Sequence, residues 1–125
     1  MNTVFDSIII GAGQAGPPLA GRLTQAGQRV ALLERKLFGG TCVNTGCIPT
    51  KTMIASARAA YVAGRAADYG IQATLAGVDL AKVIRRKSEV VESFRSSMEK
   101  HIAETKNLTL LRGAASFTSP KTLRI

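Results

Sequence analysis

Two short, compact hydrophobic runs near the N-terminus are separated by a stretch with helical spacing. The runs cover residues 4–10 and 30–33, and their length, with glycine or an acid at the end, is typical of buried strands. Small or apolar residues recur between them at helical spacing: Leu19, Ala20, Leu23 and Ala26. Gly27 follows, and glycine often ends a helix. The pattern predicts a strand, a helix and a second strand, which form a βαβ unit.

The remaining sequence predicts two helices and several short strands. An alanine-rich helix is expected over residues 52–67, and residues 74–79 form a loop or short strand in which Asp79 can cap the next helix. Residues 81–105 predict a long amphipathic helix. Its apolar positions recur every three or four residues: Val83, Ile84, Val90, Val91, Phe94, Met98 and Ile102. Short strands are expected at residues 108–112, 115–117 and 122–125, around turns at Gly113 and Ser119-Pro120.

These elements predict an α/β fold of the Rossmann type, with a parallel sheet and additional short β-strands. The chain has 125 residues, enough for one modest domain or part of a larger one. It ends on strand-like sequence with no closing helix. This abrupt end suggests that residues 1–125 are a fragment.

Composition narrows the function. No apolar run reaches the roughly 18 to 20 residues that span a bilayer, and no basic leader precedes the first run. The net charge of +9 raises the possibility of nucleic-acid binding, but the basic residues are scattered and Trp is absent. We interpret the basic cluster at residues 85–87 as a solvated helix face. The sequence predicts a cytoplasmic protein that binds neither nucleic acid nor membrane.

A glycine cluster follows the first predicted strand and opens the first predicted helix. In a G-x-G-x-x-G motif, Gly11 permits the tight turn, Gly13 lets a pyrophosphate approach the backbone, and Gly16 lets the helix pack against the strand. Glu34 lies 23 positions after Gly11, near the offset of about 20 for a carboxylate that binds ribose hydroxyls. A purely structural turn is the alternative. The full context favours a dinucleotide other than NADP, and it does not separate NAD from FAD.

Both cysteines, Cys42 and Cys47, lie in one segment rich in glycine and threonine. Two thiolates and the distant His101 fall short of the four ligands of structural zinc, so no metal site is predicted. Ordinary unpaired thiols and a redox-active disulfide remain as alternatives. In a regular helix, residues five apart have Cα atoms roughly 8 to 9 Å apart. A disulfide needs about 4.4 to 6.8 Å, so the segment must bend if the two cysteines pair.

Gly46 makes such a bend easier. Pro49 is tolerated if Cys47 lies near the start of the helix that carries Lys51, where the helix dipole would favour a thiolate. These features favour a pair that opens and closes.

The run GGTCVNTGCIPTK, residues 39–51, closely resembles the redox-active segment of the pyridine nucleotide-disulfide oxidoreductases. Glutathione reductase, dihydrolipoamide dehydrogenase and mercuric reductase belong to that family. DSIIIGAGQAG and VALLER resemble its FAD-binding start, and LLRGAASFTSPKTLRI resembles its next sheet segment. The resemblance covers essentially the whole chain, and its cysteine motif leans slightly toward mercuric-reductase-like members.

The resemblance implies FAD as cofactor, with NAD(P)H as a co-substrate bound by a domain outside this chain. It places Gly11, Gly13 and Gly16 at the pyrophosphate and Glu34 at the adenosine ribose. Further residues would continue along the cofactor: Arg35, Lys36, Gly40, Thr41, Lys51 near the flavin and Ala115 at the adenine end. Cys47 would be the sulfur beside the flavin, and Cys42 the one that exchanges with substrate.

The implied activity transfers electrons from NAD(P)H through flavin to the Cys42–Cys47 disulfide. A small-molecule disulfide or a metal ion would be the substrate, and the full-length protein would be a homodimer. The NAD(P)-binding and dimerisation domains are expected beyond Ile125, so the isolated piece should be inactive. A non-catalytic nucleotide-binding module with redox-sensing cysteines is the alternative.

Overall fold

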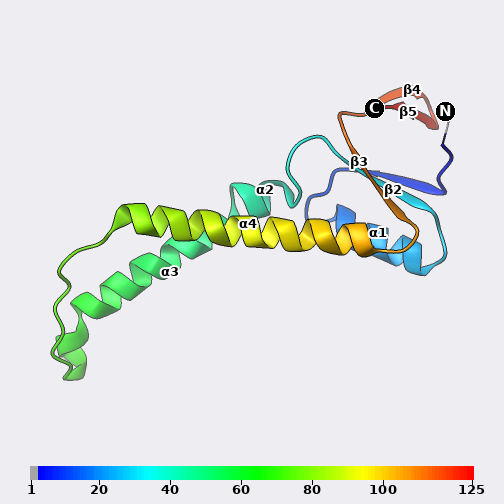
Figure 1. The fold of residues 1–125 in the computed structure, drawn as a ribbon. Helices are drawn as coiled ribbons and strands as arrows, with labels where there is room; N and C mark the ends of the chain where they lie inside the picture. The colour runs from blue at the N-terminus through cyan, green and yellow to red at the C-terminus, as the bar shows by residue number, and fades with distance from the viewer. Residues whose placement is uncertain (1–2) are drawn as a thin grey trace.

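The computed structural model describes residues 3–125 and contains the expected βαβ unit at its start (Figure 1). Strand β1 (Ser7–Ile10), helix α1 (Gly16–Gln25) and strand β2 (Val30–Glu34) follow one another. Strand β3 (Leu108–Arg112) joins the same sheet after a long excursion of the chain. The strand order is β1-β2-β3, and both pairs are parallel. The predicted α/β class with a parallel sheet is confirmed.

Strand β2 is buried and β1 is not. Residues from Val30 to Leu33 are at most 1% exposed because β2 lies between two strands. In β1, Ile8 and Ile10 are 40% and 55% exposed. The prediction of a strand over residues 4–10 that is buried throughout was therefore wrong in length and in burial. The cause is position, since β1 pairs with β2 alone and one of its faces is open.

Helix α1 is framed by prolines and a glycine, of which the glycine was predicted. Pro17 and Pro18 occupy the first turn, where a backbone N–H has no partner within the helix. Gly27 follows the helix with φ of +86°, a conformation that glycine adopts without a steric penalty. The prolines therefore fit the start of α1 without loss of a backbone hydrogen bond, and Gly27 fits the left-handed conformation after its end.

The cysteine segment is more regular than the sequence indicated. A short helix α2 (Gly40–Asn44) precedes helix α3 (Cys47–Gly64), and a 3₁₀ turn η1 (Ala66–Tyr69) follows. The predicted start of the alanine-rich helix at residue 52 was wrong by five positions. Pro49 needs no N–H partner in a first turn, so it does not delay the helix.

Helix α4 (Leu80–Glu104) returns along α3 to the sheet. Its N-cap is Asp79, whose carboxylate accepts a hydrogen bond of 2.9 Å from the Lys82 backbone N–H, as predicted. Figure 1 shows α3 and α4 as a hairpin that extends away from the sheet. Of the predicted apolar face only Val91 and Ile102 are buried, while Ile84 and Phe94 are about half exposed, so residues 3–125 leave much of this face uncovered.

The core lies where α4 crosses the sheet. It contains Ala12, Leu32, Phe38 and Ile102, all at most 2% exposed. Strands β4 (Ser116–Ser119) and β5 (Thr122–Arg124) form a separate antiparallel hairpin near the expected positions. The core thus holds the ends of β1 and β2 against the segment that carries the cysteines.

Candidate nucleotide and dithiol site

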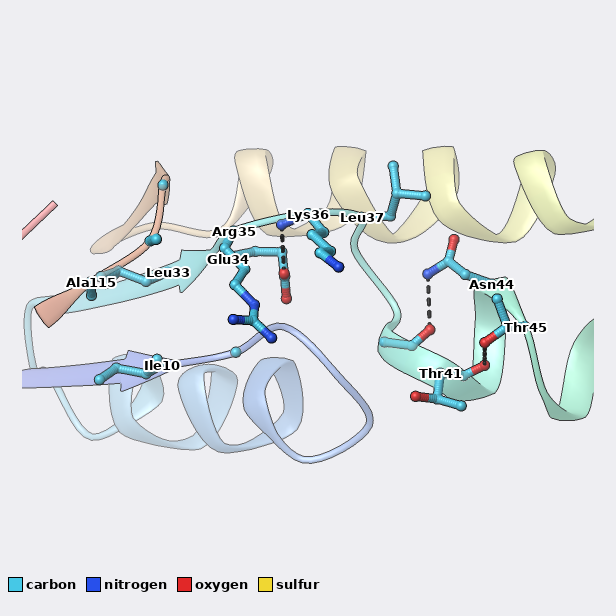
Figure 2. A pocket seen from close by; sticks show the side chains of 14 residues that line it. Ile10, Leu33, Glu34, Arg35, Lys36, Leu37, Thr41, Asn44, Thr45 and Ala115 are labelled. Carbon is cyan, nitrogen blue, oxygen red and sulfur yellow. Dashed lines mark hydrogen bonds between the residues drawn. The ribbon is translucent and has the colours of Figure 1, made fainter.

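A cavity of about 720 Å³ opens at the carboxyl ends of β1 and β2, beside α2 (Figure 2). Open parallel sheets bind ligands at this edge. Seven of the residues predicted to contact a nucleotide line it: Gly11, Glu34, Arg35, Lys36, Gly40, Thr41 and Ala115. They come from four separate segments of the chain. Gly13, Gly16 and Lys51 were also predicted to contact the nucleotide, but they do not line this cavity.

Gly13 and Gly16 do not line the cavity but allow close packing between the segments that do. A methyl group placed on Gly16 would lie 2.1 Å from the Gly11 carbonyl oxygen, so only glycine allows this helix-to-strand approach. A methyl group on Gly40 would lie 3.0 Å from the Gly13 Cα atom. The start of α2 is therefore packed directly on the glycine turn, which joins the turn to the cysteine segment.

Glu34 fastens the end of β2 to the glycine turn. Its Oε2 accepts a hydrogen bond of 3.0 Å from the Ala12 N–H, and its Oε1 accepts one of 2.8 Å from the Lys36 N–H. Desolvation acts to raise the pKa of Glu34, but the N–H groups of Ala12, Lys36 and Arg35 and the Arg35 charge together lower it. Glu34 is thus held as a carboxylate on the wall of the cavity.

Two positively charged side chains, Arg35 and Lys36, also line the cavity. Figure 2 shows the side chains of Arg35 and Lys36 between the end of β2 and the α2 segment. The N-cap of α1, Ala15, makes no side-chain hydrogen bond, and no acidic residue lies in the first turn. Two cations beside one carboxylate suit a ligand that carries both phosphates and hydroxyls.

The bend between α2 and α3 brings the two cysteines together. A methyl group on Gly46 would lie 3.0 Å from the Thr41 carbonyl oxygen and 3.5 Å from the Cys42 Cα atom, so the chain folds tightly back over α2 here. Cys47 is the first residue of α3, which meets the condition under which the sequence analysis expected Pro49 to be tolerated. Both cysteines are free thiols; Cys42 is half-buried and Cys47 is exposed.

The thiols interact with each other. The pKa of Cys42 is raised, first because its thiol hydrogen-bonds with the Cys47 side chain and then because of desolvation. The backbone N–H of Cys47 and the positive charge of Lys51 act in the opposite direction. The predicted bend is therefore present with both thiols reduced, and Cys47 and Lys51 both influence the pKa of the Cys42 thiol.

The family model of the pyridine nucleotide-disulphide oxidoreductases matches residues 5–124. The chain belongs to this family. It is 37% identical to dihydrolipoyl dehydrogenase from Chlamydia muridarum over its full length, which is 27% of that relative. It is 35% identical to mercuric reductase from Staphylococcus aureus over 97% of the chain and 22% of that relative.

A solved structure of the same family resembles the fold closely. The Cu(II) complex of a mutant of the HOCl-induced flavoprotein disulfide reductase RclA from Escherichia coli matches with a TM-score of 0.80 and 35% identity. The match covers the whole of this chain and 25% of that one. The chain thus spans about a quarter of the length of the relatives it matches, and it corresponds to the N-terminal portion of an oxidoreductase of this family.

Several residues that line the cavity were not predicted from the sequence: Ile10, Leu33, Leu37, Asn44, Thr45, Gly113 and Ala114. Most are apolar or small, and nothing in the pattern distinguishes them from core residues. Asn44 is different, because a polar residue between two cysteines is a signal that could have been followed. Its side chain makes hydrogen bonds to α2 and α4.

The described residues, 3–125, contain neither a candidate membrane-spanning helix nor a candidate metal cluster. In this part of the chain, no helix combines the length and hydrophobicity that crossing a bilayer requires. Nor do three or more His, Cys, Asp or Glu side chains gather within it in an arrangement that could hold a metal ion.

Proposed function

We propose that residues 1–125 form the N-terminal part of the FAD-binding domain of an FAD-dependent oxidoreductase. In this proposal, electrons from NAD(P)H pass through FAD to the Cys42–Cys47 pair and then to a disulfide or metal-ion substrate. One observation carries the proposal: the bend at Gly46 folds the start of α3, with Cys47, back over the α2 turn that carries Cys42, and that turn also walls the cavity. Family membership supports the same activity.

The residues of the cavity fit FAD. Gly16 packs too closely on Gly11 to leave room for a side chain, so the turn presents backbone that a pyrophosphate can approach. The Glu34 carboxylate has acceptor capacity beyond its two backbone hydrogen bonds, and this suits ribose hydroxyls. When bound, FAD supplies a carrier that takes two electrons from NAD(P)H and delivers them to the cysteine pair.

Each predicted residue has a role within this proposal. Glu34 binds the adenosine ribose and Ala115 contacts the adenine. Arg35, Lys36 and the backbone of Gly11 and Gly13 face the phosphates. Gly40 and Thr41 continue the wall toward the cysteines. Lys51 places a positive charge near Cys42, where it favours anionic groups.

The dithiol reacts with a disulfide substrate by two exchanges. The Cys42 thiolate attacks one substrate sulfur, which forms a mixed disulfide and releases the first substrate thiolate. The Cys47 thiolate then attacks Cys42, closes the Cys42–Cys47 disulfide and releases the second thiolate. Two electrons leave the pair, and the two protons of the dithiol go to the released thiolates. We assign Cys47 to the flavin side.

A metal ion is the alternative substrate. Mercuric reductase from Staphylococcus aureus is among the relatives, and RclA has been solved as a Cu(II) complex. Two adjacent thiolates are soft ligands that such ions prefer. The slight resemblance of the motif to mercuric reductases supports this choice, while dihydrolipoyl dehydrogenase favours a disulfide substrate.

The rest of the proposed enzyme lies outside these residues. We propose that separate domains bind NAD(P)H and form a homodimer, and that the 125 residues alone oxidise no NAD(P)H. A cytoplasmic location, where NAD(P)H is available, completes the proposal. Nucleic acid and membrane are not proposed as partners.

A two-step experiment tests the proposal. Titration of the 125-residue chain into FAD should quench flavin fluorescence saturably, and ADP should reverse the quenching. The chain is next oxidised with glutathione disulfide, loaded with FAD and illuminated anaerobically with EDTA to reduce the flavin. Alkylation should then reveal two new thiols per chain, and fewer when ADP is in excess. A redox-sensing module predicts binding of FAD without new thiols.

A further inference from the structure

One polar side chain links the cysteine segment to the rest of the fold. Asn44 is the last residue of α2 and lies between the two cysteines in sequence. Its Nδ2 donates hydrogen bonds to the carbonyl oxygens of Phe38, at 2.8 Å, and Gly40, at 2.9 Å. Figure 2 shows Asn44 directed back along α2, away from the bend. Asn44 therefore ties the end of α2 to its own first residue and to a residue of the core.

The opposite side of the Asn44 amide is held by α4. The Oδ1 atom accepts a hydrogen bond of 3.0 Å from Nη1 of Arg95. Arg95 is itself fixed, because its Nη2 is paired with the Glu92 carboxylate and its side chain is only 19% exposed. Ser96 donates a further hydrogen bond of 3.1 Å to Glu92. All polar atoms of the Asn44 amide are thus engaged by partly or fully buried groups.

This arrangement fixes the α2 turn while the thiols are still reduced. Cys42 lies in the middle of a five-residue helix, which would fray without side-chain support. A cysteine pair forms a disulfide more readily when the folded chain already holds the two sulfurs close together, since less conformational freedom is then lost.

We propose that Asn44, anchored by Arg95, is a positioning residue that sets the equilibrium between the Cys42–Cys47 dithiol and its disulfide. The inference rests on the proposed function, because it concerns the same cysteine pair. The reaction is balanced with a small disulfide as oxidant. One chain dithiol and one glutathione disulfide give one chain disulfide and two glutathione thiols, so two electrons and two protons leave the chain.

The test measures this equilibrium in the 125-residue chain, in glutathione redox buffers and without flavin, by trapping thiols with iodoacetamide and counting them by mass spectrometry. Asn44→Ala and Arg95→Ala should each lower the equilibrium constant for disulfide formation by about tenfold, a rise of about 30 mV in reduction potential. Arg95→Lys should restore most of the loss. Combining Asn44→Ala with Arg95→Ala should add nothing to Asn44→Ala alone.

Arg86→Ala is the matched control. Arg86 also lies on α4 and also hydrogen-bonds to the cysteine-bearing helices, but its partner is the Thr52 carbonyl oxygen, after both cysteines. It should leave the equilibrium constant within about twofold. An equal effect of Arg86→Ala, or a change below about twofold in Arg95→Ala, overturns the inference.

Circular dichroism separates a loss of cysteine positioning from a loss of folding. If Asn44→Ala fails to reach the circular dichroism of the parent chain, Arg95→Ala and Arg95→Lys decide, because they leave every bond within α2 intact. The two proposals also fail differently. A parent chain whose thiols never pair in glutathione buffer overturns both. A parent chain that pairs normally and a variant that pairs equally well overturn the positioning role alone.

Discussion

The backbone N–H of Ala12 donates a hydrogen bond of 3.0 Å to the carboxylate of Glu34. Ala12 is the completely buried residue in the middle of the glycine turn, and Glu34 is the last residue of β2. The contact joins the turn after β1 to the end of the neighbouring strand. Glu34 therefore holds the cavity wall in shape, in addition to the ligand role that we propose for it.

This contact predicts an acid dependence of stability. Backbone N–H donors lower the pKa of Glu34 in the folded chain relative to the unfolded one. Its contribution to the free energy of unfolding is therefore fully present above the unfolded pKa of about 4.3 and is lost as the pH falls through the lower folded value. Glu34→Gln should remove that part of the slope and cost about 1 kcal/mol at neutral pH.

Urea unfolding followed by circular dichroism between neutral and acidic pH measures both effects. Glu89→Gln is the control, because Glu89 lies on the exposed surface of α4. It should leave the acid slope as it is in the parent chain. Equal slopes in the parent chain and Glu34→Gln would contradict the structural role given to this carboxylate.

The two glycines of α1 predict opposite effects of the same substitution. Gly16→Ala forces a methyl group to within 2.1 Å of a backbone oxygen, whereas a methyl group on Gly21 meets no atom within 4 Å. Gly16→Ala should destabilise the chain by about 1 to 3 kcal/mol because α1 must move away from β1. Gly21→Ala should stabilise it by about 0.5 to 1 kcal/mol through the unfolded state.

Urea midpoints of the two variants give the comparison, and FAD titration adds a functional readout. Gly16→Ala should weaken FAD binding, since the turn that we propose to receive the pyrophosphate shifts with the helix. Gly21→Ala should bind as the parent chain does. Equal stability of both variants is the result that rules out close packing at Gly16.

Local sequence features predicted the elements of the fold well at positions where a residue type has a single well-defined structural role. Asp79 as a helix cap and Gly27 after a helix were both confirmed. The exposure of Ile8 and Ile10 could not be predicted, because it depends on which strands flank β1 and on what covers its second face. Periodicity records which residues are apolar but does not record what packs against them.

The residues of the candidate site also fall into two groups: those that the sequence pointed to and those that it did not. The motif pointed to Glu34 and the cysteines because their chemistry stands out in the sequence, and the structure places Glu34 on the cavity wall and the cysteines on either side of the Gly46 bend. It did not identify Asn44, whose role depends on Arg95, 51 residues away on another helix. The contact arises only because α4 returns beside α2, and no local pattern in the sequence encodes that return.

The N-cap of α4 predicts a stability change far from the cavity. The Asp79 carboxylate satisfies the Lys82 N–H, one of the donors that a helix leaves free in its first turn. Asp79→Ala should lower the free energy of unfolding by about 1 kcal/mol. Asp79→Asn keeps an acceptor oxygen and should lose only a small part of that. Identical urea midpoints for Asp79→Ala and the parent chain would show that the cap contributes nothing.

The contact between the thiols predicts how Cys42 titrates. Its hydrogen bond with Cys47 raises the pKa of Cys42, so at neutral pH Cys42 should be alkylated more slowly than an ordinary exposed cysteine. Cys47→Ala removes that hydrogen bond but keeps the backbone N–H that stabilises the thiolate, so the pKa of Cys42 should fall. Lys51→Gln removes a stabilising positive charge, so the pKa should rise.

Alkylation of Cys42 by iodoacetamide, followed by mass spectrometry across a pH series, separates these cases. The two variants shift the pH midpoint in opposite directions if the neighbours act through charge and hydrogen bonding. A general loosening of the α2 segment would instead shift both variants toward the behaviour of an ordinary thiol. Because Lys51→Gln is expected to move away from that value, its direction decides whether Lys51 acts electrostatically on Cys42.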